Sequence, residues 1–210
     1  MTEPSTVQPG QERGLRRREQ TIEAATAAFM KRGFAKTSLQ SIVRESGGSL
    51  RDIYAWFGEK EGLFRAAVIE AVSGVMDALD EVSHSADDPR IALEQFARAL
   101  LLVLIEPRTV ALYRVVLGEA VHQPGIAHAF QNAAPEEAVR RLSEKLHIWA
   151  EAGLISAPDP EWLARQTIEV IKGSMHNRAL LDPEFRPSSA DIEKQASSAI
   201  NLIWNGMAPK

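Results

Sequence analysis

The amino-acid sequence predicts an all-α protein with two helical domains. Apolar residues recur at helical spacing through most of the 210 residues, and proline, glycine and short polar runs separate these segments. No segment alternates apolar and polar residues as a half-buried strand would. Hydrophobic residues make up 45% of the chain, which is enough to bury a substantial core. We expect an N-terminal three-helix domain that contains a helix-turn-helix, followed by a larger C-terminal helical domain.

The first helix is expected from about Leu15 to Arg32. Ile22, Ala25 and Phe29 repeat there at helical spacing, and Gly33 can adopt the left-handed conformation that ends a helix. The domain boundaries that follow are a disordered arm over residues 1–12, the helix-turn-helix domain over 13–60 and the second domain over 61–210.

Residues 37–60, TSLQSIVRESGGSLRDIYAWFGEK, are predicted to form two short helices joined by a glycine turn. Thr37 lies three residues before Gln40, and Ser49 lies three residues before Asp52. Both pairs fit the capping box, in which two side chains satisfy the free N–H groups of a helix start. Two adjacent helix starts with a sharp turn between them indicate a helix-turn-helix.

Each of these short helices has one apolar face. The expected inward-facing residues are Leu39, Ile42 and Val43 on the first helix and Ile53 and Phe57 on the second. The opposite face of the second helix, which carries Leu50, Arg51, Tyr54 and Ala55, is left free to meet a partner.

A longer helix is expected from about residue 60 to residue 82, followed by a polar break over 84–89. Breaks that contain proline separate the further helices, which are expected over Pro89–Ile105, Arg108–His122, Ile126–Gln131, Glu136–Ala152, Pro160–Leu181 and Ser189–Asn205. Asp159 can cap the fifth of these with Pro160 in its first turn, and Ser188 with Asp191 forms a capping box for the sixth.

The last two helices are candidates for a contact between two subunits. An apolar stripe with small residues, which permit close helix packing, runs along the final helix: Ile192, Ala196, Ala199, Ile200 and Ile203. A four-helix interface between two copies would use such a stripe. A stripe in the core of a single chain would have the same spacing.

Charge and cysteine content limit the function and the compartment. The chain has no cysteine, which excludes disulfides, thiolate metal sites and thiol catalysis. The net charge of −4 is uneven: residues 12–60 carry ten Lys or Arg and six Asp or Glu, whereas residues 61–210 carry fourteen and twenty-one. The basic part coincides with the helix-turn-helix, where Arg13, Arg16, Arg17 and Arg18 suit a phosphate backbone, although a solvated arm would fit them equally well.

The ends and apolar runs give no sign of a membrane segment. Residues 1–14 are polar with two prolines, so we expect neither a signal peptide nor an anchor, and the longest apolar run, 99–105, is shorter than the roughly 20 residues that span a bilayer. We expect a cytoplasmic protein.

A series of short motifs follows in order between Arg17 and Leu63: Phe29, Gly33-Phe34, Thr37-Ser38, Ile42, Gly47, Ser49, Ile53-Tyr54, Trp56-Phe57, Lys60-Glu61 and Leu63. Together they resemble the N-terminal DNA-binding domain of the tetracycline repressor (TetR/AcrR) family. Three positions depart from the family pattern: Arg51 replaces a common glycine, Asp52 a usual threonine and Glu59 a small capping residue. The operator sequence is therefore not predicted.

The resemblance implies a homodimer that binds a roughly palindromic double-stranded DNA operator, with the second short helix of each copy in a major groove. Its implied DNA contacts are Thr37, Gln40, Leu50, Arg51, Tyr54, Trp56 and Lys60. We hypothesise that Arg51 reads a guanine through O6 and N7. Alternatively, Arg51 contacts a phosphate or forms an ion pair with Asp52 or Glu45.

The resemblance also implies that the second domain holds a pocket for a small hydrophobic or aromatic effector, which would release the repressor from DNA. The candidate lining residues are Phe96, Leu100, Leu104, Tyr113, Leu117, Phe130, Trp149 and Met175, and the candidate polar contacts are Arg114, His122, His147 and His176. Each of these residues also suits an ordinary core or surface position.

The sequence bears on two other classes of function. The sequence contains no HExxH, GxSxG, Walker or Rossmann motif, so we expect no enzyme activity, metal or cofactor. The alternative to a regulator is a helical ligand-binding or protein-interaction module whose helix-turn-helix no longer binds DNA, an interpretation motivated by the acidic Asp52 and Glu59.

Overall fold

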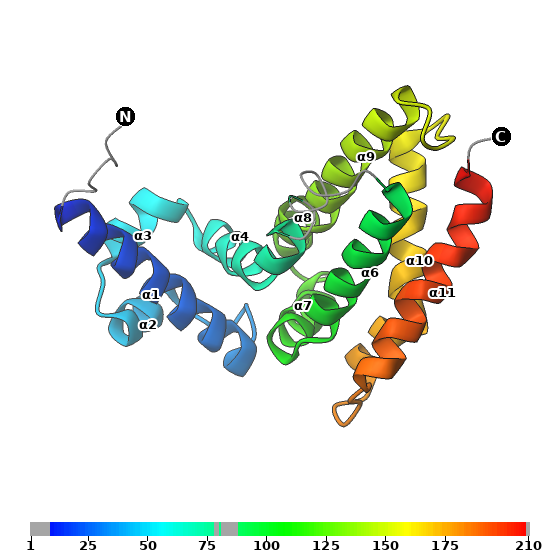
Figure 1. Ribbon diagram of the computed structural model, residues 1–210. Coiled ribbons are helices and arrows are strands. Elements are labelled where there is room, and N and C mark those ends of the chain that lie inside the picture. The colour runs from blue at the N-terminus through cyan, green and yellow to red at the C-terminus, as the bar shows by residue number, and fades with distance from the viewer. Residues whose placement is uncertain (1–8, 78–79, 81–87, 209–210) are drawn as a thin grey trace, which may run out of the picture. The chain divides into compact units, whose positions relative to one another are not determined.

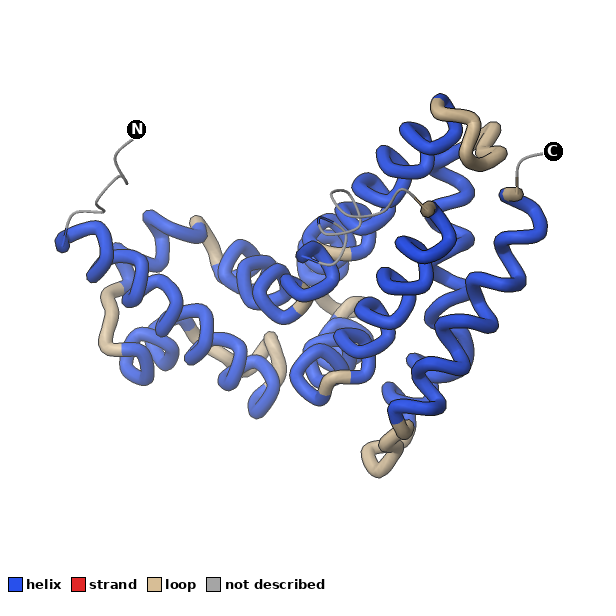
Figure 2. Tube along the Cα trace, viewed as in Figure 1, coloured by secondary structure: helices blue, strands red, loops and turns tan. Residues whose placement is uncertain are grey.

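The computed structural model describes residues 9–77, 80 and 88–208 (Figure 1). Helices joined by turns and bends make up this part of the chain, and no strand occurs in it (Figure 2), which confirms the all-α prediction. The helices are α1 (Pro9–Arg32), α2 (Leu39–Ser46), α3 (Leu50–Phe57), α4 (Lys60–Ala71), α6 (Pro89–Ile105), α7 (Pro107–Glu119), α8 (Pro124–Ala133), α9 (Pro135–Glu151), α10 (Pro160–Leu181) and α11 (Ser189–Met207).

The chain divides into two compact units. The head unit consists of residues up to 67 together with 115–129, and the body unit consists of 68–114 together with the residues from 130 onward. The predicted boundary between residues 60 and 61 stays a prediction.

Helix α1 begins at Pro9, earlier than expected. Proline suits the first turn of a helix because its missing N–H would have no partner there, and Glu12 in the same turn interacts favourably with the helix dipole. Residues 9–12, which were expected in the disordered arm, are therefore helical, and residues 1–8 lie outside the described part of the chain.

The start of α2 differs from the prediction by one residue. Ser38, and not Thr37, is the N-cap, and its hydroxyl accepts a hydrogen bond from the Ser41 amide at 3.2 Å. Thr37 points inward and donates its hydroxyl to the Gly33 carbonyl at 2.8 Å. The predicted capping box of Thr37 and Gln40 was wrong. The Thr37 hydroxyl is instead used at the end of α1, where the last carbonyls have no helical partner and accept its hydrogen bond.

The head unit contains the predicted helix-turn-helix around an aromatic core. Ser49 caps α3 by accepting a hydrogen bond from the Asp52 amide at 3.1 Å, which confirms the predicted second helix start. Gly47 ends α2 in the left-handed conformation at φ 71°. The rings of Phe29, Phe34 and Phe64 pack together with centroid separations of 5.4–5.6 Å, and Ile42 and Ile53 are buried as expected.

The long helix expected over 60–82 is interrupted. Helix α4 ends at Ala71, a turn follows at Val72, and residues 73–77 are helical again; residues 78, 79, 81 and 82 lie outside the described part. The hydroxyl of Thr109 donates to the Ala71 carbonyl at 3.3 Å and so satisfies a group that the break leaves without a helical partner.

In the body unit, α6, α9, α10 and α11 pack against one another around one hydrophobic core (Figure 1). Asp88, Asp159 and Ser188 cap α6, α10 and α11, and Ser188 with Asp191 forms the predicted capping box. Four members of the α11 stripe, Ile192, Ala196, Ala199 and Ile200, are buried in this core. The stripe therefore serves the single chain, as the alternative interpretation proposed. None of the described helices is sufficiently long and apolar to cross a membrane.

Candidate DNA-binding surface and body cavity

The outward face of α3 presents side chains to solvent. Arg51 and Ala55 are exposed, Tyr54 is 56% exposed, and Ile53 on the opposite side of the helix is buried. Among the described residues, Arg51 has no ion-pair partner, and Glu45 is bound by Arg32 at 2.9 Å. Glu45 therefore pairs with Arg32 and not with Arg51. The Arg51 guanidinium is available to an external hydrogen-bond acceptor.

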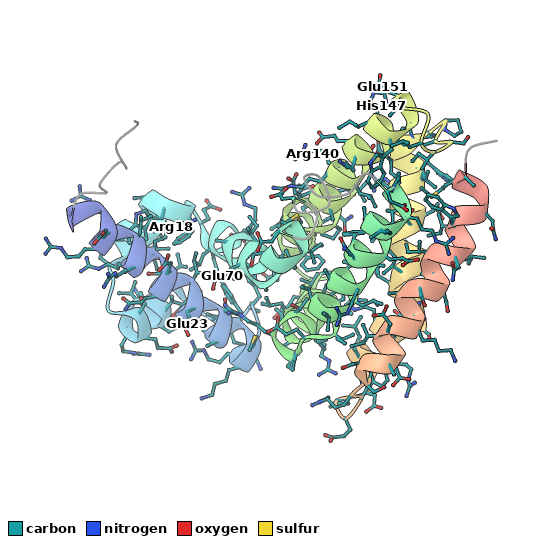
Figure 3. All side chains as sticks on the ribbon, viewed as in Figure 1. Arg18, Glu23, Glu70, Arg140, His147 and Glu151 are labelled. Atoms are coloured by element: carbon teal, nitrogen blue, oxygen red, sulfur yellow. The ribbon has the colours of Figure 1, made fainter. Side chains whose placement is uncertain are left out.

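Basic and aromatic side chains surround this face. Gln40 is exposed on α2, Leu50 is half-buried at the start of α3, and the half-buried Trp56 ring packs edge-on against Phe57 with centroids 6.1 Å apart. The guanidinium of Arg18 lies 5.1 Å from the centre of the Phe57 ring. This contact places Arg18 of α1, which is labelled in Figure 3, beside the end of α3.

Two predicted DNA contacts have roles inside the head unit. Thr37 is 2% exposed and turned inward, so its side chain cannot reach DNA in this conformation. The ammonium of Lys60 lies 4.3 Å from the centre of the Phe34 ring and 3.4 Å from the Ala35 carbonyl. Burial is the main cause that lowers the pKa of Lys60, and the carboxylates of Glu61 and Glu119 oppose this effect.

Glu119 at the end of α7 is a residue that the sequence did not single out. Its carboxylate accepts a hydrogen bond from the Ala35 amide at 3.0 Å, in the connection between α1 and α2. Glu119 and Ala35 are 84 residues apart in the sequence, so no local pattern indicates this contact.

The body unit contains a cavity of about 290 Å³. Its lining residues are Val72, Val75, Met76, Leu100, Leu104, Tyr113, Gln131, Ala134, Pro135, Ala138, Val139, Arg165, Gln166, Ile168, Glu169 and Lys172. Three of the predicted effector contacts, Leu100, Leu104 and Tyr113, belong to this lining. Aliphatic side chains dominate it, as is usual for sites that bind small molecules.

The other predicted effector contacts lie elsewhere. Phe96 and Trp149 are core residues, and Met175 lines a separate open groove between α10 and α11. Arg114 donates to the Ala179 and Leu180 carbonyls near the end of α10. Leu117 and His122 are exposed in the segment 115–129 of the head unit, and His147 is exposed 3.5 Å from Glu151 near the end of α9 (Figure 3).

Tyr113 connects the cavity to a buried histidine. Its ring packs edge-on against Phe130 and against His176, with centroid separations of 4.5 and 4.7 Å. His176 is 3% exposed, its Nδ1 lies 3.2 Å from the Leu104 carbonyl oxygen, and its Nε2 has no hydrogen-bond partner among the described residues. Burial lowers the pKa of His176 and raises the pKa of Tyr113 to about 12, so both side chains are neutral at pH 7.

The polar wall of the cavity was not predicted from the sequence. Arg165, Glu169 and Lys172 project from one side of α10 at intervals of four and three residues. Their spacing around the buried Ile168 was a signal for a charged stripe at the edge of an apolar face.

Just beyond Lys172, α10 is kinked at Gly173, where φ is 48° and ψ is −147°. The amide of Gln195 donates to the carbonyls of Val170 and Ile171 at 3.4 and 3.1 Å, two groups that the kink frees from helical pairing. The positive φ at position 173 favours glycine, and a Cβ there would lie 2.5 Å from the Gln195 amide nitrogen and would displace that side chain.

Two family models match this chain, one in the N-terminal part of the sequence and one in the C-terminal part. Residues 22–67 match the family model described as bacterial regulatory proteins, tetR family, and residues 91–205 match that of the AefR-like transcriptional repressor, C-terminal domain. Among curated proteins, the chain is 33% identical over 72 residues to the HTH-type transcriptional regulator YfiR of Bacillus subtilis strain 168 and to BetI 2 of Chromohalobacter salexigens. The matched stretch covers 34% of this chain and about a third of each relative, 34% and 35%.

Solved structures match over nearly the whole chain. A TetR-family transcriptional regulator from Mesorhizobium loti MAFF303099 aligns with a TM-score of 0.79 at 27% identity, covering 93% of this chain and 98% of that one. The flavonoid-responsive regulator FrrA aligns with a TM-score of 0.74 at 26% identity with the same coverage. The likeness therefore includes the body unit as well as the helix-turn-helix.

Proposed function

The chain belongs to the TetR family of transcriptional regulators, and we propose that it is a homodimeric repressor that a small molecule releases from a roughly palindromic operator. The observation that carries the DNA-binding part is the exposed face of α3, on which Arg51 has no protein partner among the described residues. We assign Arg51 to a guanine in each half-site and Tyr54 and Trp56 to the DNA backbone. Lys60 would join the backbone contacts by moving its ammonium away from the Phe34 ring and the Ala35 carbonyl.

The proposed dimer forms through α10 and α11. Regulators of this family form dimers, and apolar side chains on both helices remain in contact with solvent in the single chain. Trp162 and Leu181 on α10 are 59% and 85% exposed, and Leu202 on α11 is 69% exposed. A contact with a second copy through these helices would remove such side chains from water, which favours association.

The proposed effector site is the body cavity. Its lining is mostly apolar, and its volume of about 290 Å³ is near the lower limit of small-molecule pockets, roughly 300–1,000 Å³. The likeness to a regulator that is named as flavonoid-responsive supports an aromatic effector. An effector that binds one body conformation more tightly would shift the population away from the DNA-binding form.

The experiment that tests the DNA-binding part is a selection of bound genomic fragments at one near-physiological salt concentration. Wild-type protein should recover a palindrome with a preferred guanine in each half-site. Arg51→Ala should lose the preference at that base, because a bidentate arginine contact contributes about 1–3 kcal/mol of discrimination. Arg98→Ala, on the body surface beside Glu193, is the matched control and should recover the same sequence as wild type.

Two outcomes contradict the proposal. An equal loss of affinity for all operator variants in Arg51→Ala would assign Arg51 to a phosphate and not to a base. Recovery of no enriched sequence at any salt concentration would instead support the non-DNA-binding helical module.

A further inference from the structure

The body cavity is chemically asymmetric. Aliphatic side chains from residues 72–76 after α4, from α6 and from α9 line most of it, whereas the charged residues of the described lining, Arg165, Glu169 and Lys172, come from one side of α10. A ligand that fills the cavity would therefore contact aliphatic side chains over most of its surface and charged side chains on the α10 side.

Lys172 is the most enclosed charged side chain of this wall. The side chain of Lys172 is 23% exposed, compared with 42% for Arg165 and 64% for Glu169. A ligand in the cavity would remove water from the Lys172 ammonium more completely than from the other two groups. An ammonium that loses its water requires a compensating partner.

The existing partners leave Lys172 with capacity for a ligand, unlike Arg165. The Arg165 guanidinium is held by both oxygens of Glu136, at 3.1 and 2.8 Å, and by Glu161 at 3.0 Å. The Lys172 ammonium contacts Glu169 at 2.8 Å, but it has three N–H donors, and the Glu169 carboxylate is largely in solvent. A mostly exposed ion pair of this kind contributes little and can be exchanged.

On the premise that this cavity is the effector site, we infer that the effector is a small apolar carboxylic acid whose carboxylate binds Lys172. The hydrocarbon or aromatic part of the acid packs against the walls formed by Leu100, Leu104 and Val139. Tyr113, which also lines the cavity and retains its proton, is a second hydrogen-bond donor for the acid. A cationic ligand is disfavoured because the two less exposed charged groups of this wall, Lys172 and Arg165, are cations, whereas the Glu169 carboxylate is 64% exposed.

The test compares two probes of the same shape, 2-naphthoic acid and 2-naphthalenemethanol, by isothermal titration calorimetry with the purified full chain at pH 7.5. The acid should bind about tenfold more tightly than the alcohol, which is the effect expected of a charge-assisted hydrogen bond. Lys172→Met should remove this preference, and Lys172→Arg should largely retain it. Lys31→Met, at an exposed lysine of α1, is the matched control and should keep the wild-type preference.

The outcomes separate this inference from the function on which it rests. Equal binding of acid and alcohol to wild type, or a preference that persists in Lys172→Met, would overturn the carboxylate inference and leave the cavity as an apolar effector site. Binding of neither probe to the wild type would overturn both the inference and the effector site, whereas operator selection, which needs no ligand, would still test DNA binding. Circular dichroism melting of Lys172→Met verifies that a lost preference does not come from unfolding.

Discussion

His176 makes the stability of the protein depend on pH. Its buried imidazole is neutral in the folded chain because burial lowers its pKa; nearby Lys172 acts in the same direction, and the Leu104 carbonyl and Glu169 oppose it. As the pH falls below about 6.5, the unfolded chain takes up a proton at this residue before the folded chain does. The free energy of unfolding should therefore decrease from pH 6.5 down to the lowered pKa of the folded state.

Urea denaturation at pH 7.5 and pH 5.5 measures this effect. The decrease should be smaller in His176→Asn, whose amide can still donate to the Leu104 carbonyl, than in wild type. The exposed His147, replaced by Asn, is the control and should leave the decrease unchanged. Glu137, whose pKa is lowered to about 2 by Arg140 and Arg141, titrates below this range. An identical decrease in His176→Asn and wild type would contradict the assignment.

Residue-level prediction succeeded where the cause is local and failed where it is tertiary. Ser49 was identified as a cap because its hydroxyl serves an amide three residues later. Thr37 and Ser38 are adjacent hydroxyl residues, and either could cap α2 by its chemistry. Ser38 is the cap because Thr37 is buried against the end of α1. The sequence also could not show whether Arg51 is free to contact a partner. The structure shows this, because it pairs Glu45 with Arg32.

At the scale of elements, α7 contributes to the head unit through its last residue. The Glu119 carboxylate satisfies the Ala35 amide between α1 and α2 and lies close enough to Lys60 to favour its charged form. Glu119→Ala should destabilise this connection by about 1 kcal/mol, the typical contribution of an exposed hydrogen bond. Amide hydrogen exchange should then become faster at Ala35 than in wild type.

The amide of Glu119→Gln retains an acceptor oxygen and serves as the control for this measurement. Its exchange at Ala35 should stay close to wild type. Equal acceleration in both variants would show that the charge near Lys60, and not the acceptor for Ala35, holds the connection. Unchanged exchange in both variants would show that the connection does not depend on Glu119.

The sequence predicted helix boundaries well where caps are encoded nearby. Helices α6 and α10 begin where expected because each start is encoded by two adjacent residues. An aspartate caps the helix and a proline follows it in the first turn, Asp88-Pro89 in α6 and Asp159-Pro160 in α10. The break after α4 and the kink in α10 were not predicted. Side chains from other helices, Thr109 of α7 and Gln195 of α11, donate hydrogen bonds to the carbonyls that lose their helical partners at those points.

For the whole molecule, helical periodicity identified the interior but could not divide it into core and cavity. Phe96 and Leu100 lie on the same face of α6, yet Phe96 is packed in the core and Leu100 borders the cavity. The difference depends on how the facing helices fill the space, which one segment of sequence does not specify. The spacing on α10 indicates a charged stripe beside Ile168, but whether this stripe borders a cavity depends on the facing helices in the same way.

If the effector acts by shifting a population, the effects of DNA and ligand on each other must be equal. A ligand that lowers operator affinity by some factor has its own affinity lowered by the same factor when operator is bound. We expect a factor between about 5 and 150, corresponding to roughly 1–3 kcal/mol of coupling. The measurement is operator binding by fluorescence anisotropy with and without saturating 2-naphthoic acid, together with calorimetry of the acid with and without saturating operator.

Ala138→Trp should fill the cavity, so that calorimetry detects no binding of the acid and the acid no longer changes operator affinity, because Ala138 lies in the body lining. Unequal factors in the two titrations would contradict a single linked equilibrium. Equal factors that both increase affinity would mean that the liganded protein is the DNA-binding form, in which case the effector is a corepressor and the cavity stabilises the conformation that the operator selects.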